Sequence, residues 1–384
     1  MADAEKLNNS VNLGEAGEYN VFVFGDHTQS NTESEGRVAV GGNAVYDDYH
    51  IGSFYVYSKR LPKPGERNDL IVGGEMDIRG GVNFSGNSVI GYLCKIKKYT
   101  MYNRNSYRGQ PYKGSPVNFK AAEQYLRHAS RYWASLPVNG AARVGEDTLF
   151  LTGEDPDLNV FNIEGPWIGE NGLLLSNLKG IVINAPLTST VLINVSGLRV
   201  GFGRCTFYRN GGAWPPPGRP ADKAHSNRIL WNFYEARYWY NIATAIKGSV
   251  LAPFADMDTL KGCIDGNIIG ASLKGGMAGR SSPFNGSLPR LGADNPDIPE
   301  AAKCPVSRQR AVDDFLKASR LAERNLSRIL NMVKNDGLGA FSSKKRLSPE
   351  IQPYLTSMFK SLQNHTHIFS RMNKAISESI KGFE

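Results

Sequence analysis

The chain has 384 residues and a formal net charge of +9, with 41% hydrophobic and 21% charged residues. This length is enough for two domains and a sizeable buried core, and the composition is typical of a globular protein. Since no run approaches the roughly 18 apolar residues of a membrane-spanning helix, we expect no membrane insertion.

Residues 1–16 are interpreted as an N-terminal extension. They contain no basic segment followed by an apolar stretch, so we expect no secretory signal and synthesis in the cytoplasm.

Residues 17–292 contain many short apolar runs, each followed by Gly, Asn or Asp; the segment GSVLAPFADMDTLKGCIDGNIIGASLKGG at 248–276 is typical. Glycine and asparagine accept the left-handed backbone conformations of sharp corners. Short strands joined by tight corners predict a mainly β fold, namely a β-solenoid (parallel β-helix), in which each coil pairs with the next. A β-sandwich is the structural alternative.

One segment of this body predicts a helix. In FKAAEQYLRHASRYWASL, helical spacing places on one face Phe119, Ala122, Tyr125, Leu126, Ala129 and Trp133. A single helix beside short strands must bury that face, so we expect it to lie along the flank of the β-coil.

Aromatic residues next to arginine indicate candidate contact surfaces. Tyr238, Trp239 and Tyr240 cannot all face the core of one strand, so at least one is expected to face outward. Trp214 lies in GGAWPPPGRP, which predicts a projecting loop or an inert excursion. Tyrosine, tryptophan and arginine are favoured at protein interfaces, and we assign these residues to a candidate self-association surface.

The composition changes near residue 300. Residues 301–384 contain 15 Lys and Arg against 7 Asp and Glu, a surplus of +8, and only 3 of the 41 glycines. We predict a linker at 293–304 and a helical hairpin at 305–384, whose apolar stripes form a coiled-coil-like contact. The stripe residues added to the candidate surface are Phe315, Leu326, Leu355, Leu362 and Phe369. The basic charge is interpreted as a solvated face, since no groove-reading motif for nucleic acid accompanies it.

Several acidic residues of the body are candidates for catalysis or metal binding. Three pairs of carboxylates could act in a glycosidase or bind Ca²⁺: Asp155 and Asp157, Asp256 and Asp258, and Asp47 and Asp48. All three pairs lie in turn-like sequences, where Asp side chains commonly cap backbone N–H groups instead. No nucleophile motif accompanies His27, so we expect no catalytic triad there. The four cysteines, Cys94, Cys205, Cys263 and Cys304, form no C-x-x-C pair and are expected to be reduced, with cross-linking in an oxidising medium as the alternative. We therefore predict no enzyme, no cofactor and no metal.

Several segments in a fixed order resemble the choice-of-anchor A domain, a bacterial surface module related to ice-binding-like adhesive β-solenoids. They are YNVFVFGDHTQSNTESEGRVAVGGNA, the helical segment above, LTGEDPDLNVFNI, VLINVSG, RILWNFYEA, IKGSVLAPFADM and CIDGNIIGASL. The resemblance covers 17–292 and implies an adhesive or structural role without known catalytic residues. The missing signal and the basic tail depart from the family pattern. They lead us to expect a spore coat, an exosporium or a parasporal inclusion.

The resulting prediction is a non-enzymatic structural or adhesive protein that associates with itself as an oligomer, filament or array in a bacterial assembly. Other coat or surface proteins are further candidate partners. A glycan-binding or carbohydrate-active β-helix protein is the alternative. Ice binding would need a flat threonine-rich face, of which only TST at 188–190 gives a hint.

Overall fold

The computed structural model describes residues 12–166, 168, 173–215 and 220–291. The chain divides into two units, Met1–Ala302 and Lys303–Glu384, and the described residues belong to the first. The predicted linker at 293–304 and hairpin at 305–384 lie outside the described residues. The described part is mainly β, as the sequence predicted, and it contains one 21-stranded and one 5-stranded sheet. None of its helices is long and apolar enough to cross a membrane.

In the 21-stranded sheet, the described strands pair in parallel and fall into rows. The first row contains, in order of pairing, β14 (Leu158–Glu164), β16 (Thr190–Ser196), β20 (Ile229–Asn232), β23 (Ser249–Thr259), β25 (Ile268–Gly275), β1 (Val21–Val23), β3 (Val38–Val40), β5 (Asn68–Val72), β8 (Asn87–Ile90) and β11 (Tyr112–Lys113).

The second row contains β17 (Arg199–Phe202), β21 (Tyr238–Asn241), the later halves of β23 and β25, then β2 (His27–Ser34), β4 (Ala44–Ile51), β6 (Met76–Arg79) and β9 (Ile96–Tyr99). The third contains β22 (Ala245–Lys247), β24 (Cys263–Asp265), β26 (Ala278–Arg280), the ends of β2 and β4, β7 (Val82–Asn83) and β10 (Tyr102–Asn103).

The 5-stranded sheet contains β12 (Ala141–Gly145), β13 (Thr148–Thr152), β15 (Gly180–Asn184), β18 (Thr206–Arg209) and β19 (Gly212–Ala213). Its outer strands β12 and β19 run antiparallel to their neighbours, while β13, β15 and β18 are parallel. Short helical turns complete the structure: η1 (Gly14–Glu18), α2 (Ser53–Tyr57), η2 (Leu175–Asn177) and α4 (Pro220–Ser226).

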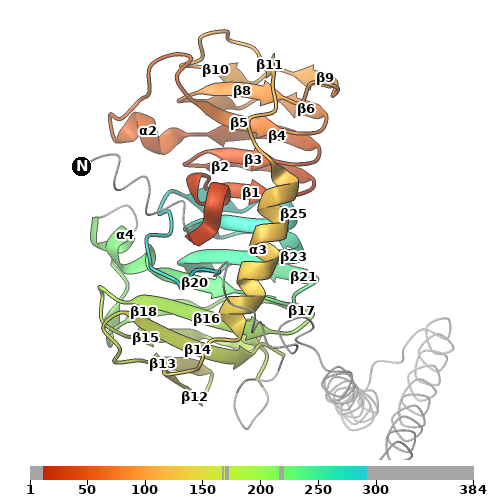
Figure 1. The fold of residues 1–384 in the computed structure, drawn as a ribbon. Coiled ribbons are helices and arrows are strands. Elements are labelled where there is room, and N and C mark those ends of the chain that lie inside the picture. Colours follow the sequence, from red (N-terminus) through yellow and green to blue (C-terminus); the bar gives the residue numbers. More distant parts are fainter. Residues whose placement is uncertain (1–11, 167, 169–172, 216–219, 292–384) are drawn as a thin grey trace, which may run out of the picture. The chain divides into compact units, whose positions relative to one another are not determined.

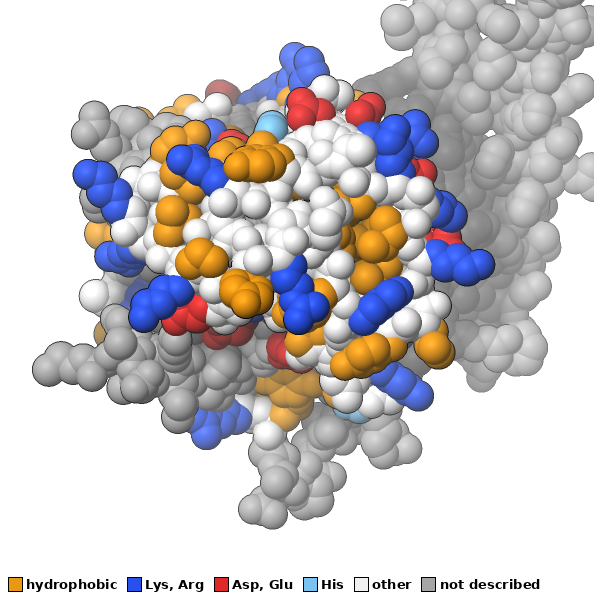
Figure 2. All heavy atoms as spheres, turned by 90° about the horizontal axis from the view of Figure 1, so that it is seen from above, with side chains coloured by type: hydrophobic (Ala, Val, Ile, Leu, Met, Phe, Trp, Pro, Cys, Tyr) orange, Lys and Arg blue, Asp and Glu red, His pale blue; other side chains and the backbone are white. Residues whose placement is uncertain are grey.

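The path of the chain brings its two halves together at the middle of the sheet. Strands β1 to β11 form one half of the body, and helix α3 (Phe119–Ala134) then runs along the flank to the opposite end. From β12 onward, the strands return from that end toward the middle of the sheet (Figure 1). Strand β25 finally pairs in parallel with β1, with Val21 opposite Ile268. The end formed by β9, β10 and β11 is therefore opposite the end formed by β12, β13 and β14. Figure 2 looks onto the former end.

Alternating side chains divide the apolar residues between two cores. Val38 and Val40 of β3 point inward and join the interior cluster, which contains residues from all rows. Ala39, between them, points outward into a second cluster beneath α3. Several first-row strands, among them β3, β16 and β20, are buried on both faces, which explains their nearly continuous apolar sequences.

Helix α3 covers the middle part of the outer face of the first row. The side chain of Asn118 caps its start by accepting a hydrogen bond from the backbone N–H of Ala121 at 3.1 Å. The buried face contains Ala122, Leu126, Ala129 and Trp133, and the flanking position agrees with the sequence prediction. Sixteen residues extend about 24 Å, close to the height of five strands at about 4.8 Å each.

Stacked amides connect α3 to the sheet. In register, Asn162, Asn194 and Asn232 occupy the same position of β14, β16 and β20. Two of these amides donate to the next strand, Asn232 to Asn194 at 2.8 Å and Asn194 to Asn162 at 3.0 Å. Asn232 also donates to the carbonyl of Ser130 in α3 at 2.8 Å. The buried polar groups thus hold the helix in one position on the sheet.

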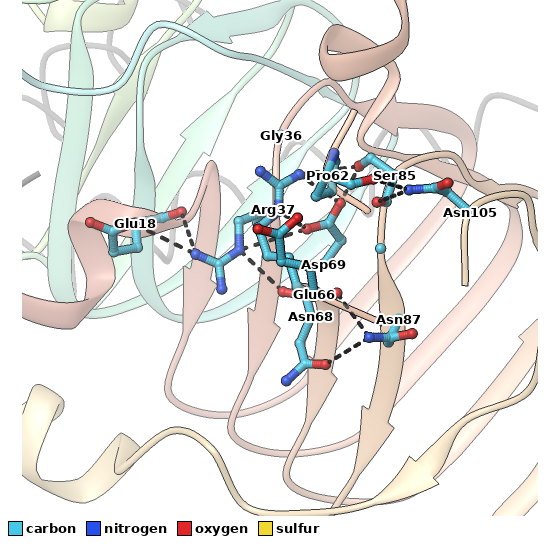
Figure 3. A network of polar contacts seen from close by, with 12 residues as sticks. Glu18, Gly36, Arg37, Pro62, Glu66, Asn68, Asp69, Ser85, Asn87 and Asn105 are labelled. Carbon is cyan, nitrogen blue, oxygen red and sulfur yellow. Dashed lines mark hydrogen bonds and ion pairs between the residues drawn. The ribbon is translucent and has the colours of Figure 1, made fainter. Parts of the chain in front are cut away.

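A second buried network fixes the corner that precedes β5 (Figure 3). The carboxylate of Asp69 is fully buried and accepts two hydrogen bonds from Arg67, at 2.6 and 3.0 Å. Ser85 donates to the same carboxylate, and Arg37 lies 3.8 Å from it. Asn105 donates to the carbonyl of Ser85 at 3.1 Å. These contacts join successive turns of the chain and satisfy a charge that would otherwise be costly to bury.

Candidate functional site

The candidate site lies on the outer face of β21, β23 and β25. Along these strands, Trp239, Met257 and Leu273 are buried and alternate with outward-facing residues. The outward residues form two lines across the strands. The first line contains Tyr238, Asp256 and Ser272, and the second contains Tyr240, Asp258 and Lys274. Because neighbouring strands are about 4.8 Å apart, side chains within a line are in direct contact range.

Hydrogen bonds within the face hold these side chains in place. The hydroxyl of Tyr238 donates to Asp258 at 3.0 Å, and the Lys274 ammonium lies 3.1 Å from the same carboxylate. Ser272 donates to Asp256 at 2.6 Å. The hydrogen bond to Asp258 raises the pKa of Lys274 above its ordinary value. Partial desolvation, followed by the bond to Asp258, raises the pKa of Tyr238.

The two tyrosine rings form an aromatic platform. Their centroids are 6.1 Å apart with an interplanar angle of 35°. The guanidinium of Arg199, one strand away, lies 4.2 Å from the centroid of Tyr238 and 5.9 Å from that of Tyr240. A cation held over an aromatic face stabilises the ring orientation.

This face borders a cavity of about 620 Å³, which we call the groove. Its lining comes from both halves of the chain. It contains Gly25, Asp26, Thr28, Tyr238, Asp256, Met257, Asp258, Ala271, Ser272, Leu273 and Lys274. Asp26 is exposed, and one of its oxygens accepts from the backbone N–H of Asn43 at 2.7 Å. The groove thus combines carboxylates, hydroxyls, an ammonium and an aromatic edge, which suit a polar ligand or a protein surface.

The structure separates the residues of the predicted self-association surface. Tyr238 and Tyr240 face outward, whereas Trp239 is fully buried against Phe233, with ring centroids 5.9 Å apart. Trp239 therefore does not belong to a surface, because strand alternation directs it into the core. The remaining predicted residues Phe315, Leu326, Leu355, Leu362 and Phe369 lie outside the described residues.

Trp214 does not project as the sequence suggested. Its ring is half-buried and packs edge-on against Phe207 at 6.2 Å. The indole N–H donates to Asp222 at 3.0 Å. Asp222 in turn belongs to a buried ionic cluster with Lys247 and Asp265, in which Lys247 is hydrogen-bonded to both carboxylates. Trp214 thus closes a polar cluster instead of presenting a free aromatic surface.

The acids considered for catalysis or Ca²⁺ occupy different environments. Asp155 caps a turn, because its side chain accepts from the N–H groups of Asp157 and Leu158 at 2.9 and 3.0 Å. These hydrogen bonds, that of Leu158 first, lower the pKa of Asp155. Asp256 and Asp258 lie within strand β23, so the expectation of a turn at these positions was wrong.

Asp47 and Asp48 likewise lie within strand β4, where a turn was expected. Asp48 has a positive φ of 52°, a local irregularity within this strand. Among the described residues, no group of three or more His, Cys, Asp or Glu side chains is arranged to hold a metal ion.

His27 is a core residue. It is fully buried, and its Nδ1 is 2.7 Å from the hydroxyl of Tyr46. Burial lowers its pKa to about 3, so the imidazole is neutral in the folded protein.

Cys94, Cys205 and Cys263 are free thiols, and Cys304 lies outside the described residues. The TST segment offers no threonine face, since Ser189 and Thr190 are buried.

Comparison with known families identifies the body of the chain. Residues 12–280 match the family described as "Putative Ice-binding-like adhesive domain". The chain belongs to this family. The match covers the 21-stranded sheet, α3 and the groove of this adhesive domain. A search of the curated proteins gives no match.

Proposed function

We propose that the protein is a non-enzymatic adhesive or structural protein that associates with itself and makes contacts through the outer faces of its sheet. The observation that carries the proposal is the groove, whose polar and aromatic side chains are held in register by parallel strands. Membership of an adhesive-domain family supports it.

The proposal includes a β-solenoid fold and the narrower choice-of-anchor A assignment. Support comes from the pairing order: β1, β3, β5, β8 and β11 follow one another along the chain, and each pairs in parallel with the next. A chain that returns to the same row after each circuit is a coil, and outward positions then repeat at every coil. Such repetition gives a regular surface for adhesion.

A contact function agrees with the bonding inside the groove. Asp256 and Asp258 each accept hydrogen bonds from neighbouring side chains, which fix their positions before any partner arrives. Preorganised polar side chains lose little conformational entropy on binding. The tyrosines add apolar contact area at a low entropic cost, which is why interfaces favour them.

Light scattering of the full-length protein over a wide concentration range tests the proposal. We expect the weight-average mass to rise with concentration, and a strict monomer throughout would contradict self-association. The double variant Tyr238→Ala, Tyr240→Ala tests the groove and should weaken the concentration dependence. Tyr208→Ala, which truncates an exposed tyrosine of the 5-stranded sheet, is the matched control.

Glycan binding is the second candidate function. The pairing of tyrosine rings with Asp26, Asp256 and Asp258 favours it, since sugars offer hydroxyl donors and apolar ring faces. Screening the protein on a glycan array separates this function from self-association. A glycan hit that Asp256→Asn weakens would support it, and turnover of that glycan would indicate a carbohydrate-active enzyme.

The expected spore-surface or inclusion location stays a prediction, which immunoelectron microscopy tests.

A further inference from the structure

The two ends of the described body carry opposite charges. At one end, residues 91–117, which contain β9, β10 and β11, include six Lys and Arg and no Asp or Glu, a net charge of +6. At the other end, residues 137–165, which contain β12, β13 and β14, include six Asp and Glu and one Arg, a net charge of −5. We call them the basic end and the acidic end.

The charged side chains at both ends are accessible. At the basic end, Lys95, Lys98, Arg104 and Arg108 are exposed. Viewed along the body, this end shows Lys and Arg side chains interspersed with hydrophobic ones, with Asp and Glu side chains mostly toward its rim (Figure 2). At the acidic end, Glu146, Glu154 and Asp157 are exposed. Opposite potentials on two exposed surfaces favour their association and steer their encounter.

The basic end also offers exposed apolar side chains, and the acidic end offers a hollow. The basic end presents several exposed apolar side chains, of which Leu93 is 98% and Tyr102 is 65% exposed. The acidic end contains a cavity of about 320 Å³ between β12 and β14, whose walls include Ala142, Val144 and Ile163. An apolar side chain from one molecule can therefore be buried in the hollow of the next.

The backbone at the two ends differs in a way that limits uncontrolled pairing. Within the described residues, β9, β10 and β11 each pair on one side. At the other end, β12 runs antiparallel to β13, and the side chain of Asn139 accepts from the N–H of Val160 in β14 at 2.7 Å. A parallel ladder therefore cannot simply continue from one molecule into the next, so side chains must determine the contact.

From these observations we propose that copies of this chain associate head to tail, with the basic end of one molecule on the acidic end of the next. This inference rests on the proposed self-association and adds a contact through the two ends to the contact proposed for the groove. An alternative role for lysines at a strand edge is to prevent aggregation by repelling other molecules. Repulsion between the two ends of neighbouring molecules would require both ends to carry the same charge, whereas these two ends carry opposite charges and attract each other. A contact between two different surfaces does not close on itself as a dimer, and it produces a filament or a ring.

Charge reversal at each end gives a direct test with the full-length protein. The basic-end variant carries Lys95→Glu, Lys98→Glu and Arg104→Glu, which changes the net charge of that end from +6 to 0 and leaves the acidic end at −5. The acidic-end variant carries Glu146→Lys, Glu154→Lys and Asp157→Lys, which changes the net charge of that end from −5 to +1 and leaves the basic end at +6. Sedimentation velocity in 50 mM NaCl should show that each variant alone associates less than the wild type. An equimolar mixture should associate well beyond the mean of the two variants.

Two controls accompany the mixing experiment. Raising NaCl to 500 mM should weaken wild-type association by about tenfold or more, because the screening length falls to a few ångströms. Reversing two exposed cations midway along the body, Arg237→Glu and Lys261→Glu, should leave association unchanged. Leu93→Ser should weaken association, whereas Leu260→Ser, at a residue that is 68% exposed elsewhere, should not.

The outcomes separate the inference from the function on which it rests. A wild-type chain that stays monomeric overturns the proposed self-association and this inference with it. A wild-type chain that associates, while the mixture gives only the mean of its components, overturns the head-to-tail contact alone. Circular dichroism of each variant shows whether its fold is retained, and the mixing result does not depend on the absolute stability of either variant.

Discussion

At the level of single residues, the buried polar side chains carry the clearest energetic consequences. His27 is neutral in the fold because burial lowers its pKa to about 3, against about 6.5 in an unfolded chain. Below pH 6.5 the unfolded chain therefore binds a proton that the folded chain does not. Stability is complete above this pH and falls as the pH drops toward 3.

The first prediction follows from this difference. Between pH 7 and pH 5, protonation of His27 should lower the free energy of unfolding by about 2 kcal/mol. Urea titrations at several pH values measure this slope. In the His27→Phe variant the slope should become smaller by that amount, whereas His128→Gln, at an exposed histidine, should keep it. An unchanged slope in His27→Phe would show that His27 is not the titrating group.

The ionic cluster of Lys247, Asp222 and Asp265 gives the second prediction. Lys247 lies 2.9 Å from Asp222, and both side chains are buried. Removing the cation leaves two carboxylates in a region of low polarity. Lys247→Met should therefore cost about 3–5 kcal/mol of unfolding free energy. Lys261→Met, at an exposed lysine, should cost less than about 0.5 kcal/mol in the same denaturation experiment.

At the level of elements, the contact between α3 and the sheet depends on Asn232. Its amide makes hydrogen bonds to Ser130 and Asn194, and Ser130 donates back to it at 2.5 Å. Asn232→Ala leaves these buried partners unsatisfied and should cost about 2–3 kcal/mol. Asn162→Ala, at the exposed end of the same stack, should cost less than about 1 kcal/mol. Equal losses in thermal or urea unfolding would contradict this account of how the helix is held.

The helix itself was predictable from the sequence, because the apolar residues from Ala122 to Trp133 follow helical spacing and Asn118 provides a start signal. The short strands were predictable for a similar reason, since glycine and asparagine interrupt each apolar run. What the pattern could not provide was the orientation of YWY at 238–240. Alternation requires the middle residue to face opposite to its neighbours, but only the packing around Trp239 shows which side is the core.

The position of Asp256 and Asp258 shows a different limit. The sequence APFADMD looks like a turn, because Pro253 removes a backbone donor. In the structure, β23 continues past this proline with an irregular register between Ala252 and Asp256, and the strand passes from the first row to the second. The groove depends on this passage, and on Asp26 and Thr28 from a part of the chain more than 200 residues away. Neither relation is visible in local sequence.

At the level of the whole molecule, the sequence indicated a neutral body and a basic C-terminal segment. The body contains its own interior core and the second core beneath α3. Deleting residues 301–384 should therefore leave a folded body whose far-ultraviolet circular dichroism is dominated by β structure, with weaker association than the full-length chain. An unfolded remnant would show that the body needs the deleted residues.

The central claim is that this body joins other copies of itself through fixed surfaces. Electron microscopy of the full-length protein, at a concentration where scattering shows association, tests it most directly. We expect bodies joined in line, with β9–β11 of one molecule facing β12–β14 of the next. Separate single bodies would contradict the account, and bodies joined only side by side would contradict the head-to-tail contact.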